Sequence, residues 1–201
     1  MRWLVLALIC SCEHLPFVTD RAGAYARLDE LPTRWAFDCQ FPDSQKWPVR
    51  SGFSYWNVLA GHEIFREEPD CSKTNEITSY LEFVVMASDA QYPYDVPFIV
   101  GNKVQIPEPT FATTSRHMIE RSQIIGAVIL FYKPWLEETS LAIQTSVARH
   151  EIGHALGFEH NGAETCLMHE YVNTEYHRYN DKPKSVCREE KDIFLALYGG
   201  R

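Results

Sequence analysis

The residues best suited to chemistry lie together between His150 and His160, in the sequence HEIGHALGFEH. His150 and His154 are separated by one helical turn, so on a helix both imidazole rings project from the same face. Histidines with this spacing can each give a ring nitrogen to one Zn²⁺ ion at about 2.0–2.1 Å. The spacing therefore predicts a metal site on a helix.

Glu151 and Gly157 extend this prediction. Glu151 cannot share the direction of His150, but it lies three residues before His154, so it can contact a water molecule at the metal without being a ligand. Its carboxylate can accept a proton from that water and pass it to a leaving amine. Gly157 can adopt a positive φ, which would end the helix and turn the chain back. The turn would bring His160 to the metal as a third ligand, leaving a fourth position open as in catalytic zinc sites.

A metal-free interpretation is also available for this segment. Helices carry solvated histidines, and a glycine at a helix end needs no metal. Each residue taken singly is more often structural than ligating, but their joint occurrence in one short window favours the metal site.

The elements that must position these residues are a helix and the strand before it. Thr139 or Ser140 can cap a long helix that runs to Gly157. Its apolar positions are Leu141, Ile143, Val147, Ile152 and Ala155. The uninterrupted apolar run Ile124–Tyr132 predicts a buried strand.

The other predicted elements place strands early in the chain and helices late. They are a short strand at 35–37, a helix at 51–59 with Phe53 and Trp56 inward, a central strand at 76–88, a proline-rich loop region at 89–109, and a closing amphipathic helix at 188–199. We expect Ile193, Ala196 and Leu197 to form the buried face of the closing helix. This order predicts an α+β fold.

The 201 residues carry a formal net charge of -8, without a lysine- or arginine-rich run. This balance argues against nucleic acid and against an anionic membrane surface as partners. The length suits one domain, expected at 35–201 after a lead-in segment at 13–34.

The first residues have the composition of a secretory signal peptide. A basic start, Met1-Arg2, precedes an apolar run at 3–9 that is too short to span a bilayer. Residues 1–12 are therefore predicted to be a leader, and the protein to be secreted or extracytoplasmic. A buried N-terminal strand is one alternative, and a lipoprotein-type anchor through Cys12 is another. No later segment could span a membrane.

Cysteine usage also points to an exported protein. Cys10 and Cys12 fall in the leader, which leaves Cys39, Cys71, Cys166 and Cys187. Four cysteines permit three pairings. We favour Cys39–Cys71 and Cys166–Cys187, because each pair closes a modest loop.

The site motif resembles that of a known family. His150, Glu151, His154, Gly157 and His160 match the H-E-x-x-H-x-x-G-x-x-H motif of metzincin metalloproteases. The segment CLMHEY resembles their Met-turn, with Met168 as its methionine and only a short gap after His160. That gap and the ending DIFLALYG are similar to matrixins. The resemblance implies a metzincin-like α+β fold: a twisted, mostly parallel five-stranded sheet, about three helices, and an active-site cleft between upper and lower subdomains.

The resemblance also implies a zinc-dependent endopeptidase that acts on an extended peptide or protein. His150, His154 and His160 would bind one catalytic Zn²⁺, Glu151 would be the general base, and Met168 would pack beneath the histidines. The strand at 124–132 would offer its edge to the substrate, and we expect a monomer. Glu170 stands where matrixins usually have proline, and the segment that binds Ca²⁺ in animal matrixins is not recognisable, so Ca²⁺ has no support.

Three other functions are consistent with the same motif. One is a catalytically silent zinc-containing peptide-binding module, although a binder has no need of Glu151. The second is a proteolytic toxin or effector of narrow specificity. The third is a zinc amidase that acts on cell-wall peptides, which the Met-turn disfavours.

Overall fold

The computed structural model describes residues 26–28, 30–71, 83–88, 98–100, 103–105, 112–119, 123–132, 139–169 and 182–200. The predicted leader at 1–12, with Cys12, lies outside the described residues, as do Glu170 and the first part of the predicted strand at 76–88.

The main sheet has six strands, where the resemblance implied five. In spatial order they are β3 (Phe65–Glu67), β2 (Thr33–Phe37), β4 (Phe83–Ser88), β8 (Gln123–Tyr132) and β7 (Ala112–Ile119), with β1 (Arg27–Leu28) also on β8. All pairings are parallel except that of β7 with β8. The additional strand is the two-residue β1, which is too short to leave a periodic pattern in the sequence.

Strand β7 was not predicted, and it changes which edge is open. It pairs with β8 along its whole length, while β4 and β1 pair with the opposite edge of β8. The expectation that residues 124–132 offer an edge to a peptide is therefore wrong, because that strand is internal. In the region predicted as loop, β5 (Phe98–Val100) and β6 (Lys103–Gln105) form a separate antiparallel pair.

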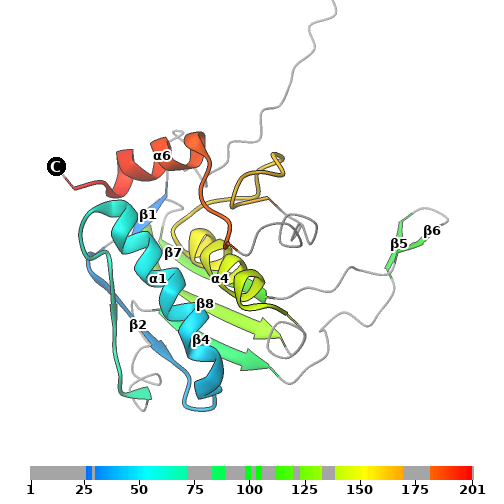
Figure 1. Cartoon of the computed structure of the whole chain (residues 1–201), viewed down its shortest axis with the longest axis horizontal. Helices are drawn as coiled ribbons and strands as arrows, with labels where there is room; N and C mark the ends of the chain where they lie inside the picture. The colour runs from blue at the N-terminus through cyan, green and yellow to red at the C-terminus, as the bar shows by residue number, and fades with distance from the viewer. Residues whose placement is uncertain are drawn as a thin grey trace, which may run out of the picture.

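The described residues form three α-helices and one short 3₁₀ helix, Asp43–Gln45. Helices α1 (Lys46–Ala60) and α4 (Leu141–Ala155) lie side by side on one face of the sheet, and α6 (Arg188–Tyr198) lies near one end of them (Figure 1). Gly52 allows α1 and α4 to come close, since a Cβ atom there would lie 2.8 Å from Ile152 Cδ1.

Aromatic side chains link these helices to each other and to the sheet. Trp35 of β2 stacks on Phe53 of α1 with ring centroids 3.9 Å apart. Trp56 is fully buried between Phe158 and Phe194, and its Nε1 donates to the Arg149 carbonyl at 3.0 Å. Each such side chain contributes about 1.5–3 kcal/mol through burial of apolar surface. The helix that carries the histidines is thus fixed to α1.

The buried face of α6 differs from the predicted one. Ile193 and Leu197 are only partly buried and Ala196 is exposed, whereas the buried residues are Glu190, Phe194 and Tyr198. The tyrosine can be buried because its hydroxyl accepts from Leu28 N at 2.9 Å and donates to the Leu156 carbonyl at 3.0 Å. These polar contacts are made by distant segments, so apolar spacing alone could not indicate them.

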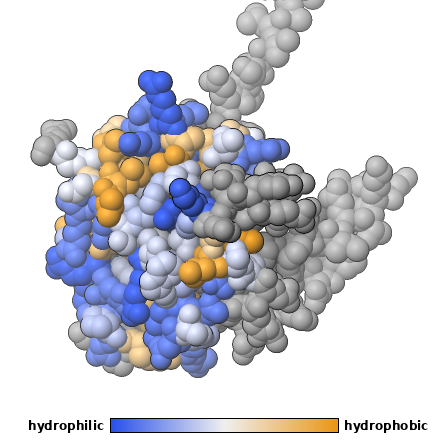
Figure 2. Space-filling view, in the orientation of Figure 1, coloured by the Kyte–Doolittle hydropathy of each residue, from blue (hydrophilic) through white to orange (hydrophobic). Residues whose placement is uncertain are grey.

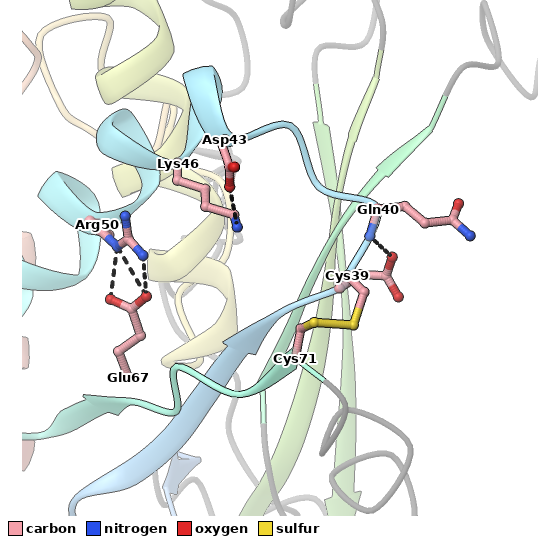
Figure 3. Close-up of polar contacts among 8 residues, drawn as sticks. Cys39, Gln40, Asp43, Lys46, Arg50, Glu67 and Cys71 are labelled. Carbon is pink, nitrogen blue, oxygen red and sulfur yellow. Dashed lines mark hydrogen bonds and ion pairs between the residues drawn. A yellow bond between two sulfur atoms is a disulfide. The ribbon is translucent and has the colours of Figure 1, made fainter.

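Both predicted disulfides, Cys39–Cys71 and Cys166–Cys187, are confirmed. Figure 3 shows the first, which joins the end of β2 to the segment after β3. Nearby, the Arg50 guanidinium of α1 makes a bidentate contact with Glu67 of β3, and Lys46 pairs with Asp43 at 2.6 Å. The Arg50–Glu67 contact joins α1 to the outer strand β3, whereas the Lys46–Asp43 pair is local to the start of α1.

Hydrophilic residues cover much of the surface seen in Figure 2, and apolar residues form separate small patches between them. Within the described part of the chain, no helix combines the length and the apolar character needed to cross a membrane.

Candidate metal centre and catalytic site

Helix α4 begins at the predicted cap, and it ends at Ala155, two residues before the predicted Gly157. Ser140 is the N-cap, and its Oγ accepts from Ile143 N at 3.4 Å. At the other end Gly157 has φ 106°, and Phe158 N donates back to the Gly153 carbonyl at 3.0 Å. Because this backbone conformation is strained for residues with a Cβ atom, glycine suits the turn. The chain then leaves the helix and reverses direction.

The turn brings His160 to the two helical histidines. His150 and His154 have ring centroids 4.6 Å apart, and His154 Nε2 lies 3.1 Å from His160 Nε2. One ring nitrogen from each of the three histidines lies within 4.8 Å of the others. The three predicted ligands are therefore adjacent in space.

The protonation of the two helical histidines, His150 and His154, suits a metal ion. His150 Nδ1 faces the Leu167 carbonyl at 2.9 Å, and His154 Nδ1 faces the Phe158 carbonyl at 2.8 Å. A carbonyl can only accept, so the proton lies on Nδ1 and each Nε2 keeps a lone pair. Burial lowers the pKa of His154 to about 4 and that of His150 well below its usual value, so both are neutral at pH 7.

The spacing of the donor atoms also suits zinc. Ligand nitrogens on a tetrahedral Zn²⁺ ion are about 3.3 Å apart at ordinary bond lengths. The 3.1 Å between His154 Nε2 and His160 Nε2 is close to this value. Carbonyls that orient the rings from behind are the usual support of metal-ligating histidines. The residues present thus fit a zinc ion with three protein ligands.

Glu151 lies between the first two histidines in sequence and is only 6% exposed. Its Oε2 accepts a hydrogen bond of 2.7 Å from the Thr114 hydroxyl of β7. Burial raises the pKa of Glu151 to about 7, and the bond from Thr114 acts in the opposite direction. A divalent cation among the histidines would also lower this pKa, because an opposite charge favours the carboxylate.

Met168 packs directly against the backbone of α4. It is fully buried, and a Cβ atom at Gly153 would lie 2.5 Å from Met168 Sδ. The glycine therefore leaves the space that the methionine occupies beneath the histidine helix. Sequence reasoning placed Met168 under the histidines, but it assigned no such role to Gly153.

Glu190 of α6 is the main support of the segment that contains Met168. Its carboxylate accepts from the backbone N–H groups of Leu167 at 3.2 Å, Met168 at 3.0 Å and Cys187 at 3.1 Å, and from Asn161 Nδ2 at 3.2 Å. Burial raises its pKa, and these four donors oppose that effect. Asn161 N also donates to the Met168 carbonyl at 2.8 Å. The segments after His160 and before His169 are thereby fixed to one another.

A second group of side chains of metal-binding type consists of Cys166, Cys187 and Glu190. Because the two cysteines are joined in a disulfide, they offer no thiolate to a metal ion.

Comparison with known protein families identifies this architecture. The matrixin family model, peptidase M10, matches residues 22–187, which is most of the chain. The chain belongs to the matrixin family. A comparison with curated proteins found no significant match. Matrixins are zinc metalloproteases with a metzincin catalytic domain, so the family agrees with the fit of the histidines to zinc.

In this matrixin, Arg116 of β7 holds the turn between the second and third histidines. Its Nη1 donates to the carbonyls of His154 and Phe158, each at 3.2 Å, and its Nη2 pairs with the Glu159 carboxylate. The side chain is only 18% exposed. Sequence reasoning missed Arg116, Thr114 and Glu190, since each is distant in sequence from the motif it contacts.

We expect Arg116→Met to weaken zinc binding by about 10–100-fold, the usual effect of removing a group that orients metal ligands. The substitution keeps the bulk of the side chain but releases the backbone around Gly157, so His160 is held less firmly. Competition with a chromophoric chelator measures the zinc dissociation constant. Arg50→Met is the matched control, because it removes the contact with Glu67 but none at the site. Equal zinc affinity in Arg116→Met and wild type would contradict the assignment.

Proposed function

We propose that this matrixin is an endopeptidase that hydrolyses peptide bonds within extended polypeptides. In this proposal His150, His154 and His160 hold one catalytic Zn²⁺ ion and Glu151 is the general base. The observation that carries the proposal is the meeting of three imidazoles, two of them on the helix that also carries the buried carboxylate of Glu151. A structural zinc site would need no such carboxylate.

Zinc, when bound, polarises the peptide carbonyl and lowers the pKa of the attacking water. The side chains of the protein supply the remaining steps. Glu151 accepts the proton of the water and delivers it to the leaving amine. The carbonyls of Leu167 and Phe158 keep Nδ1 of His150 and His154 protonated, so that Nε2 of each ring remains a donor to the metal.

The outer edge of β7 is the proposed position of the substrate backbone. β7 uses one edge to pair with β8, and none of the described strands pairs with its other edge. An extended peptide could add there through main-chain hydrogen bonds, which fix register with little demand on sequence. The cleft would then lie between an upper subdomain containing the sheet and a lower one containing the segment after His160.

We also propose that the protein is exported and monomeric. Two disulfides are typical of proteins that fold in an oxidising compartment. This supports residues 1–12 as a leader. In the same proposal residues 13–34 are the lead-in and residues 35–201 the catalytic domain. Lipid attachment at Cys12 is the alternative to free secretion.

Digestion of a proteome-derived peptide library tests the function directly. The purified protein is incubated with the library, and mass spectrometry identifies new termini. We expect cleavage at internal bonds that stops on addition of a zinc chelator and returns with added zinc. A protein that contains zinc but produces no new termini would contradict the proposal and would favour the binding module.

A further inference from the structure

Thr114 connects the edge strand of the sheet to the buried carboxylate of the site. It lies on β7, and its partly buried side chain reaches α4. Thr114 Oγ1 is 2.7 Å from Glu151 Oε2 and 3.1 Å from the Glu151 carbonyl oxygen. The two residues come from segments 37 positions apart, so the contact depends on the tertiary fold.

The hydroxyl acts mainly on the carboxylate. A threonine hydroxyl has one proton to donate, and the carboxylate oxygen is the closer of its two acceptors. Within the described part of the chain, no other side chain donates to Glu151. Oε2 is therefore held by the strand, and Oε1 is left for a water molecule.

An unheld glutamate would have several rotamers available, and only some would direct an oxygen toward the histidines. Proton transfer requires a donor–acceptor distance of about 2.6–3.2 Å, so the position of the base matters as much as its basicity. A hydrogen bond from a rigid strand restricts the rotamers of the base before substrate arrives.

We propose that Thr114 is a positioning residue, which holds the Glu151 carboxylate so that Oε1 faces the water of hydrolysis. This inference rests on the proposed endopeptidase function. Thr114 contacts neither metal nor substrate in this role and acts only through Glu151. Since β7 is also the strand whose outer edge suits the substrate, one element would set both the register of the peptide and the position of the base.

A purely structural role makes a different prediction. If the hydroxyl only ties β7 to α4 through the Glu151 carbonyl, its removal lowers thermal stability and disturbs substrate binding. If it positions the base, its removal lowers kcat while KM, zinc affinity and melting temperature change little.

The experiment compares Thr114→Val, Thr114→Ser and Thr114→Ala with wild type, using a peptide that the library shows to be cleaved. We expect Thr114→Val to lower kcat by about 10–100-fold, the effect of losing one hydrogen bond to a charged group. KM should stay within about twofold, because the same interaction is absent from substrate binding. Thr114→Ser should restore most of kcat, and zinc affinity should not change in any variant.

Thr145→Val is the matched control. Thr145 lies on α4, the helix that carries Glu151, and among the described groups its buried hydroxyl has no hydrogen-bond partner. The same exchange of side chains there should leave kcat unchanged. If Thr114→Val does not fold, the comparison of Thr114→Ser with Thr114→Ala gives the same test, since the serine variant retains the hydroxyl.

Three results would overturn the inference: a kcat for Thr114→Val within about twofold of wild type, a serine variant as impaired as the alanine variant, or a loss that appears in KM and melting temperature alone. A wild-type protein that cleaves nothing overturns both this inference and the proposed function. A wild type that is active, with an inactive Glu151→Gln variant, sustains the function and leaves Thr114 to be decided by its own variants.

Discussion

Replacement of Glu151 by glutamine is expected to lower kcat by about 10²–10⁴-fold, the usual contribution of a general acid–base group. Glutamine has nearly the same shape, so it can accept the hydrogen bond from Thr114, but it cannot take up the proton of the water. The three histidines and the carbonyls that orient them are unchanged. Zinc content, measured by atomic absorption, should therefore remain that of wild type.

The control for this substitution is Glu164→Gln. Glu164 is exposed and lies on the segment between His160 and Met168, so it tests the loss of a nearby negative charge alone. We expect wild-type kcat and zinc content. Full activity in Glu151→Gln would place the base elsewhere, and loss of zinc in that variant would indicate a structural role for the carboxylate.

Glu190→Ala is expected to have the largest effect on stability. The substitution removes the acceptor of three backbone N–H groups and of Asn161 Nδ2, all close to the metal centre. Each buried donor left unsatisfied costs about 1–3 kcal/mol. Water that enters the cavity would offset part of this loss. We expect a fall of at least about 3 kcal/mol in the free energy of unfolding, or on the order of 10 °C in melting temperature. Circular dichroism with zinc chelated measures it without the contribution of metal binding.

Glu189→Ala is the matched control, because Glu189 is the exposed neighbour on the same helical turn. Its removal loses only a favourable charge at the helix N-terminus, worth about 0.3–1 kcal/mol. Equal melting temperatures for the two variants would contradict the role of Glu190 in holding the Met168 segment.

The meeting of the three histidines was predictable because its determinants are local. His150 and His154 are placed by the period of one helix, and Gly157 supplies the turn to His160 within the same window. The helix boundaries follow from a serine cap and a glycine. The disulfide pairing was also predictable, since closing short loops is favoured over closing long ones.

The support of the centre could not be predicted in the same way. Strand β7 has the sequence ATTSRHMI, which lacks the apolar alternation of a half-buried strand. Thr114 and Arg116 act on groups of α4 and its turn, so their roles exist only once β7 is placed beside that helix. Glu190 is similar: a glutamate in the first turn of a helix is ordinarily solvated, and it is buried here because distant backbone donors meet it.

The most direct measurement of the central claim is a crystal structure with anomalous diffraction data collected on either side of the zinc absorption edge. The expected result is one strong anomalous peak at about 2.0–2.1 Å from a ring nitrogen of each of His150, His154 and His160. A zinc-loaded protein with no peak at these rings, or with the His160 ring turned away from the other two, would contradict it.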